Sequence, residues 1–140
     1  MRLREHPLTL LLLIMLVAFA VRMGFASWWQ FQHLPVQVRF EFPDSESYWE
    51  LGQRIATGRP YEFGSPDRKA FRAPGYPVIL AGMFTIAGKN ASPFAARVLG
   101  ACLGTISVGL VYWCARPSFG STAGLCGAAL MAIDPGQIAT

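Results

Sequence analysis

Residues 7–29 form an apolar run in which Arg22 is the only charged residue, and this run sets the strongest limit on the fold. About 20 helical residues cross the hydrocarbon core of a bilayer at 1.5 Å each, so the run is long enough for one crossing. Trp28 and Trp29 near its end suit the membrane interface. The run therefore predicts a transmembrane helix.

Two features of this run allow other interpretations. The segment Ala18-Phe19-Ala20, which follows the basic residues Arg2 and Arg4, resembles a signal-peptide cleavage site. The apolar character continues to Trp29, however, and this continuation favours an uncleaved membrane anchor. Arg22 lies in the last third of the helix, where it either snorkels toward the interface or pairs with a carboxylate or a phosphate.

The composition is that of an integral membrane protein. Of the 140 residues, 53% are apolar and 14% are charged, and the mean hydropathy is +0.36. The net charge of +4 is dispersed and forms no basic stripe, so we expect no nucleic-acid partner. The cysteines lie in apolar segments without metal-ligand spacing and the histidines are isolated, so neither type defines a metal site: Cys102, Cys114, Cys126, His6 and His33.

Two more apolar runs, at 92–115 and 119–140, predict further transmembrane helices. A short link at Arg116-Pro117 is expected between them. Residues 30–91 then form one large loop between the first and second helices. The chain is thus expected to be a single membrane module over residues 1–140.

Two short helices are expected within the large loop. Residues 44–57 follow Pro43 and end before Gly58, with Asp44 expected as the N-cap. Residues 74–88 are apolar, but their length and prolines favour a surface or re-entrant helix over a full crossing. Both helices are therefore expected to lie at the membrane surface. The predicted fold is all-α, with three transmembrane helices and two juxtamembrane helices.

The basic residues that flank the spans set the expected orientation. Arg2 and Arg4 before the first span, and Arg116 between the second and third, favour a cytoplasmic N-terminus. The large loop is then extracytoplasmic, at a bacterial inner membrane. It nevertheless holds most of the basic residues, and phosphate binding is one reason to keep them on that side.

Motif order gives the chain a resemblance to a known family. An Asp-x-x-x-Tyr motif starts at Asp44, an Arg-x-Pro-Gly-Tyr-Pro motif starts at Arg72, and Ala-Ala-Arg-Val-Leu opens the next span at 95–99. This order resembles the N-terminal part of membrane glycosyltransferases of the GT-C fold. The closest group is glycosyltransferase family 39 with its bacterial relatives, the protein mannosyltransferase and aminoarabinose transferase types. The break at Ile133-Asp134-Pro135 also resembles that family.

The resemblance implies transfer of a sugar from a polyprenyl-phosphate donor to a lipid, protein or glycan acceptor on the outer membrane face. It implies that Asp44, with Glu46 as its neighbour, serves the acceptor hydroxyl or a bound divalent metal. Relatives often carry two adjacent acids, whereas this chain has Asp-Ser-Glu. The donor phosphate would be bound by Arg72, with Arg59 and Lys69 as further candidates. Because family members are much longer, the chain is expected to be an N-terminal portion that is inactive alone.

The same chemistry follows from the residue types. A positioned carboxylate can accept the proton of a weakly nucleophilic sugar hydroxyl, and a guanidinium can bind the leaving phosphate through paired donors. A small non-catalytic membrane scaffold or subunit is the alternative function. Catalysis needs Asp44 and Arg72 within a substrate's width of each other, and a scaffold does not.

Overall fold

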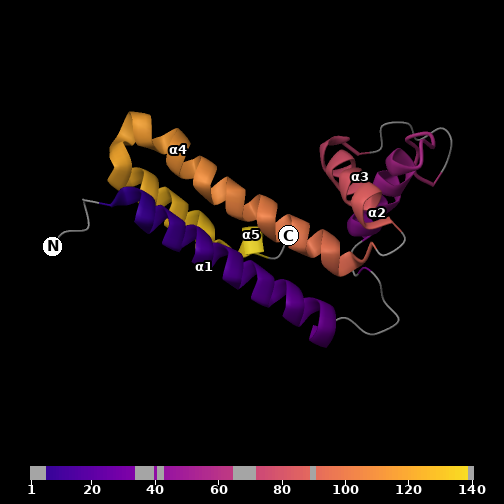
Figure 1. The fold of residues 1–140 in the computed structure, drawn as a ribbon, viewed down its shortest axis with the longest axis horizontal. Helices are drawn as coiled ribbons and strands as arrows, with labels where there is room; N and C mark the ends of the chain where they lie inside the picture. The colour runs from indigo at the N-terminus through magenta and orange to yellow at the C-terminus, as the bar shows by residue number, and fades with distance from the viewer. Residues whose placement is uncertain (1–5, 34–39, 41–42, 65–71, 89–90, 139–140) are drawn as a thin grey trace. The chain divides into compact units, whose positions relative to one another are not determined.

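The computed structural model describes residues 6–33, 40, 43–64, 72–88 and 91–138, and these residues are helical without any strand. The chain divides into two compact units, which we call the long-helix unit (Met1–His33 with Arg97–Thr140) and the two-helix unit (Leu34–Ala96). Figure 1 shows the helices in chain order, and the all-α prediction is confirmed for the described residues: α1 (Pro7–Trp28), the π-helical turn η1 (Trp29–His33), α2 (Pro43–Ala56), α3 (Gly75–Ala87), α4 (Pro93–Ile133) and α5 (Pro135–Ile138).

Two helical stretches are long and apolar enough to cross a membrane, Pro7–Gln32 and Pro93–Ile133. Both expose large apolar side chains along their length, among them Leu12, Leu16, Leu110 and Leu130. Burying one such side chain away from water is worth about 1.5–3 kcal/mol, so a surface of this kind favours hydrocarbon over water. The protein is therefore an integral membrane protein.

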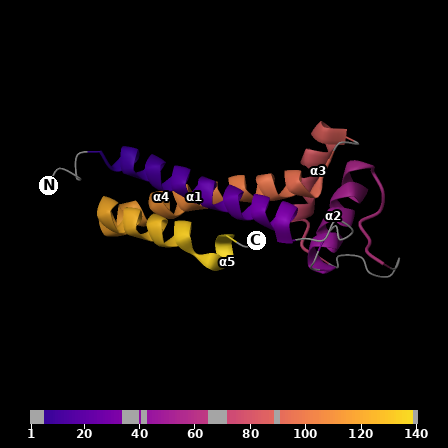
Figure 2. The same ribbon diagram turned by 90° about the horizontal axis from the view of Figure 1, so that it is seen from below.

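A sharp reversal at Gly120 divides α4 into two arms, residues 93–119 and 121–133. Gly120 has φ 82° and ψ 167°, a conformation that glycine adopts at little cost and that other residues avoid. The prediction of a link at Arg116-Pro117 is wrong, because the helix continues through Pro117 and reverses only at Gly120. Figures 1 and 2 show the second arm running back along the first.

The second arm is shorter than the predicted third span. Residues 121–133 are about 20 Å long at 1.5 Å per residue, against about 30 Å for the hydrocarbon core. A third crossing therefore stays a prediction. The arm ends at Ile133, where the resemblance had implied a break, and the short helix α5 follows from Pro135. Asp134 accepts a hydrogen bond from the backbone N–H of Gly136 at 2.9 Å, which caps α5.

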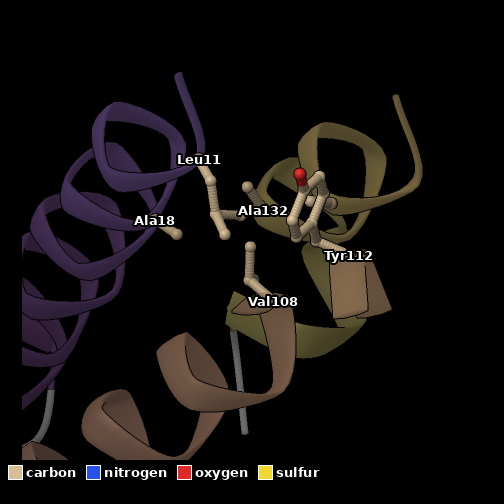
Figure 3. Packing of buried hydrophobic residues seen from close by; sticks show 6 residues of the cluster. Leu11, Ala18, Val108, Tyr112 and Ala132 are labelled. Atoms are coloured by element: carbon tan, nitrogen blue, oxygen red, sulfur yellow. The ribbon is translucent and has the colours of Figure 1, made fainter. Parts of the chain in front are cut away.

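The core of the long-helix unit joins α1 to both arms of α4. Figure 3 shows side chains from all three segments facing one another: Leu11 and Ala18 from α1, Val108 and Tyr112 from the first arm, and Ala132 from the second. Small residues allow the close approach. A Cβ on Gly124 would lie 3.0 Å from the Tyr112 ring, and a Cβ on Gly109 would lie 3.3 Å from the Met15 thioether. Interfaces between membrane helices commonly use small residues in this way.

Helix α2 has clear start and stop signals. Pro43 is its first residue, so Asp44 lies inside the first turn and is not the N-cap that the sequence predicted. At the other end, Gly58 adopts φ 67° and its N–H donates to the Ile55 carbonyl at 3.1 Å. The N–H of Arg59 donates to the Arg54 carbonyl at 2.8 Å, which completes a Schellman motif. Gly58 therefore ends the helix as predicted.

The two-helix unit is held together by packing between α2 and α3. The Trp49 ring meets the Phe84 ring edge to face, with centroids 4.7 Å apart. Gly52 of α2 lies directly against α3, where an added Cβ would come within 2.8 Å of the Leu80 Cβ and 3.3 Å of the Pro77 carbonyl oxygen. The absence of a side chain at Gly52 therefore sets how closely the two helices approach.

We predict that Gly52→Ala destabilises the two-helix unit by about 1–3 kcal/mol, the usual cost of overpacking. Gly82→Ala is the matched control, because Gly82 lies within α3 and a Cβ there meets nothing within 4 Å. Alanine is the better helix former, so the control should be neutral or slightly stabilising. Hydrogen exchange of α2 and α3 peptides, measured by mass spectrometry, checks both variants. Equal protection in the two would contradict the close contact at Gly52.

Candidate functional site

The structure brings Asp44 and Arg72 together. Asp44 lies in the first turn of α2, and Arg72 lies just before α3, 28 residues further along the chain. The Arg72 guanidinium forms an ion pair with the Asp44 carboxylate, in which it donates from Nη2 to Oδ1. The Asp44 side chain is 66% exposed and that of Arg72 is 27% exposed. The pair is thus accessible from solvent while the arginine is partly enclosed.

Ser47 holds both partners and is itself buried. Its hydroxyl donates to the backbone carbonyl of Asp44 at 2.7 Å and accepts from Nε of Arg72 at 3.4 Å. One serine, a single helical turn after Asp44, therefore links the helix start to the guanidinium. Ser47 was not predicted from the sequence. Its spacing of three residues from the predicted acid placed it on the same helix face and was the available signal.

Two tyrosines also contact Arg72. The guanidinium carbon lies 5.5 Å from the centre of the Tyr48 ring, within the range of a cation–π contact. The Tyr61 hydroxyl donates to the Arg72 backbone carbonyl at 2.9 Å. Burial, reinforced by the neighbouring Tyr48, raises the pKa of Tyr61, so this phenol stays protonated and able to donate at physiological pH.

Tyr76 supports this arrangement from α3. Its ring meets the Tyr48 ring edge to face, with centroids 5.6 Å apart. The Tyr48 ring therefore contacts both Tyr76 and the Arg72 guanidinium. We call Asp44, Ser47, Tyr48, Tyr61 and Arg72 the Arg72 cluster.

Glu46 does not join the Arg72 cluster. It follows Asp44 by two residues, which places it about 200° around the helix. Its side chain is exposed on the first turn of α2. Both acids lie near the helix N-terminus, where the helix dipole favours negative charge. Only Asp44 faces the arginine.

Arg59 is not among the residues of the Arg72 cluster. It lies past the C-terminal end of α2, two residues before Tyr61. Arg59 instead lines a cavity of about 470 Å³ together with Arg54, Phe84 and Gly88. Arg54 is paired there with Glu50, since its Nε and Nη2 donate to one carboxylate oxygen at 3.0 and 2.8 Å. Lys69, the remaining candidate, lies outside the described residues.

The chain offers no ready-made metal site in its described part. There, no three side chains of histidine, cysteine, aspartate or glutamate gather closely enough to hold a metal ion. Asp44 is the acid that the sequence singled out for a metal, and the group it meets is the Arg72 guanidinium. The site therefore combines one carboxylate and one cation, a pairing suited to proton transfer and to anion binding.

No curated protein and no solved structure matches the chain. The sequence model of one family, described as dolichyl-phosphate-mannose-protein mannosyltransferase, matches residues 71–140 of the 140. The match begins one residue before Arg72 and takes in α3, α4 and α5. The family resemblance inferred from motif order is confirmed, and the chain belongs to the dolichyl-phosphate-mannose-protein mannosyltransferase family.

Proposed function

We propose that this chain is the N-terminal membrane module of a glycosyltransferase that uses a polyprenyl-phosphate sugar donor. The sugar passes to a lipid, protein or glycan acceptor on the extracytoplasmic face of the membrane. The observation that carries this proposal is the contact between Asp44 and Arg72 in a chain of this family. The proposed catalysis needs the two side chains within a substrate's width of each other, and a non-catalytic scaffold does not.

Asp44 is the proposed general base. In the transfer, the acceptor oxygen forms a bond to the anomeric carbon while the bond from that carbon to the phosphate oxygen breaks. The acceptor proton passes to the Asp44 carboxylate, and the polyprenyl phosphate leaves with the electron pair. A positioned base of this kind contributes about 10²–10⁴-fold to a rate. The exposure of the Asp44 side chain leaves room for an acceptor hydroxyl beside it.

Arg72 is the proposed ligand of the donor phosphate. A phosphate is itself an anion, so it can replace the Asp44 carboxylate on the guanidinium when the donor binds. That exchange frees the carboxylate to accept a proton. Ser47 and Tyr48 also contact the Arg72 guanidinium, and these contacts do not involve Asp44. They therefore hold the guanidinium in place during the exchange. Arg72 is a stronger candidate than Arg59, because Arg72 is the arginine that contacts Asp44.

Our first prediction for this function concerns the two charges. Asp44→Asn should lower transfer by about 10²-fold or more, because it removes the base. Stability should change by no more than about 1 kcal/mol, since exposed ion pairs contribute little. Arg72→Lys keeps the charge but loses the planar fork of donors, so it should weaken donor binding. The assay measures sugar transfer by the purified full-length protein from polyprenyl-phosphate mannose and, separately, polyprenyl-phosphate aminoarabinose.

Glu46→Gln is the matched control for Asp44→Asn. It removes the same charge from the same helical turn, on the side away from Arg72, and should transfer at close to the parent rate. If Asp44→Asn also transfers at the parent rate, Asp44 is not the base and its ion pair is structural.

A second prediction tests whether Ser47 positions Arg72, with Ser45 as the control. Ser47→Ala removes the acceptor for Arg72 Nε, and the loss of about 1 kcal/mol should raise the KM for donor about fivefold, with a smaller change in kcat. Ser45→Ala is the control, because Ser45 is exposed on the same turn. The two variants are compared in the transfer assay. Matching KM values for both would show that Ser47 does not position Arg72.

A third prediction concerns orientation. Thr57 is exposed in the two-helix unit, and Ser118 is exposed beside the reversal of α4. If the loop is extracytoplasmic, Thr57→Cys should react with a membrane-impermeant thiol reagent in intact cells. Ser118→Cys should react only after the membrane is permeabilised. Both are made in a chain whose native cysteines are replaced by alanine. The opposite pattern would reverse the proposed orientation.

A further inference from the structure

Arg22 is a charged residue in the middle of the long-helix unit that the proposed reaction does not use. It belongs to α1, within an otherwise uncharged apolar helix, yet it is only 3% exposed. A snorkelling arginine would direct its guanidinium outward, along the helix and toward the interface. Arg22 instead directs it inward, between α1 and α4. The side chain therefore has a partner inside the protein.

The partners of Arg22 are backbone carbonyls. Nη1 donates to the Ala18 carbonyl at 3.1 Å and to the Ala132 carbonyl at 3.4 Å. Nη2 donates to the Met131 carbonyl at 3.3 Å. Met131 and Ala132 lie in the last turn of the second arm of α4, which ends at Ile133. Two of the four carbonyls that a helix end leaves without an internal donor thus receive one from α1.

The second arm needs this help because of where and how it ends. Pro135 has no backbone N–H to donate and cannot continue a helix, so the open carbonyls receive nothing from it. The Ala132 carbonyl is buried away from water, and a buried carbonyl must find its donor within the protein. The negative end of the helix dipole also attracts a cation at this point. The buried Arg22 guanidinium supplies both the missing hydrogen-bond donors and the positive charge at this helix end.

Gly104 of the first arm makes the space for this side chain. A Cβ at that position would lie 2.8 Å from Arg22 Nε and 3.3 Å from its Cδ, closer than neighbouring atoms tolerate. The arginine stem therefore passes over bare backbone on its way to the second arm. One side chain from α1 thus touches both arms of α4, at Gly104 on the first and at Ala132 on the second.

We infer that Arg22 caps the C-terminal end of the second arm of α4. The absence of a side chain at Gly104 leaves the space that Arg22 needs to reach this end. Together they fix how α1 and the two arms of α4 pack. An ionisable residue in a membrane span is ordinarily suspected of binding substrate or ions. Here the terminal nitrogens are bonded to carbonyls and the guanidinium is closed off from solvent, so the charge serves the fold.

If Arg22 caps the second arm, the effect of Gly104→Ala on the thermal midpoint should change sign when Arg22 is removed. With Arg22 present, Gly104→Ala should lower the thermal midpoint by about 5 °C or more, because the new methyl meets the arginine. In an Arg22→Ala background the same change should leave the midpoint unchanged or raise it, since the space is vacated and alanine is the better helix former. Arg22→Lys keeps the charge with fewer donors and should fall between the parent and Arg22→Ala.

Unfolding is followed in the detergent-purified full-length protein by the reactivity of Cys102. Cys102 is half-buried on α4, and the exposed Cys114 and Cys126 are replaced by alanine, so a thiol-reactive dye reports on the opening of the helix that Arg22 caps. Gly24→Ala is the matched control. Gly24 lies in α1 two residues from Arg22, and a Cβ there meets nothing within 4 Å. It should not lower the midpoint in either background.

Equal effects of Gly104→Ala in the two backgrounds would overturn the proposal, as would an Arg22→Lys midpoint equal to that of the parent. If Arg22→Ala does not fold, the comparison of Gly104→Ala with Gly24→Ala in the parent still decides. A lowered midpoint for Gly104→Ala alone supports the close contact between Gly104 and Arg22, and identical midpoints for the two variants refute it. None of these readouts depends on sugar transfer.

Discussion

Every backbone polar group within hydrocarbon must be bonded inside the protein, and the long-helix unit follows from that constraint. Its chain is helical wherever it is apolar, and it departs from helix at few places. At Gly120 the residue type lowers the cost of the reversal, because glycine tolerates φ 82°. At Ile133 the cost is lowered by another segment, because Arg22 supplies donors to the carbonyls of Met131 and Ala132. A charge in a membrane helix is then explained by a helix end elsewhere in the chain.

A comparison of Arg22 with Arg72 shows that burial decides whether an arginine side chain is accessible to an anion. Arg22 is almost completely enclosed and its terminal nitrogens donate to backbone carbonyls, which leaves no access for a substrate anion. Arg72 is 27% exposed and faces a carboxylate, a hydroxyl and an aromatic ring. Its partners hold the guanidinium from several sides without closing it off. Of the two, Arg72 alone has the accessibility that anion binding requires.

The sequence predicted the helices well because hydropathy and length depend on local composition. It also predicted the stop at Gly58, where a Schellman motif forms, and it singled out Asp44 and Arg72, which the structure brings together. It misplaced the turn in α4 at Arg116-Pro117, because a proline near a helix end can keep helical φ whereas the reversal needed the positive φ of Gly120. It could not find the partners of Arg22, which come from residues about 110 positions away. Ser47 was missed because a serine acquires a role only from the guanidinium that reaches it.

The weakness of the Asp44–Arg72 ion pair is an argument for its proposed use. An exposed pair of this kind contributes about 0–1 kcal/mol to stability, so it can open without loss of the fold. The Arg72 backbone is held independently, by the Tyr61 hydroxyl on its carbonyl, and its side chain by Ser47 and Tyr48. Opening the pair therefore releases the carboxylate while the guanidinium keeps its position. The backbone and the side chain of Arg72 thus keep contacts of their own when the pair opens, as an exchange of the carboxylate for a phosphate would require.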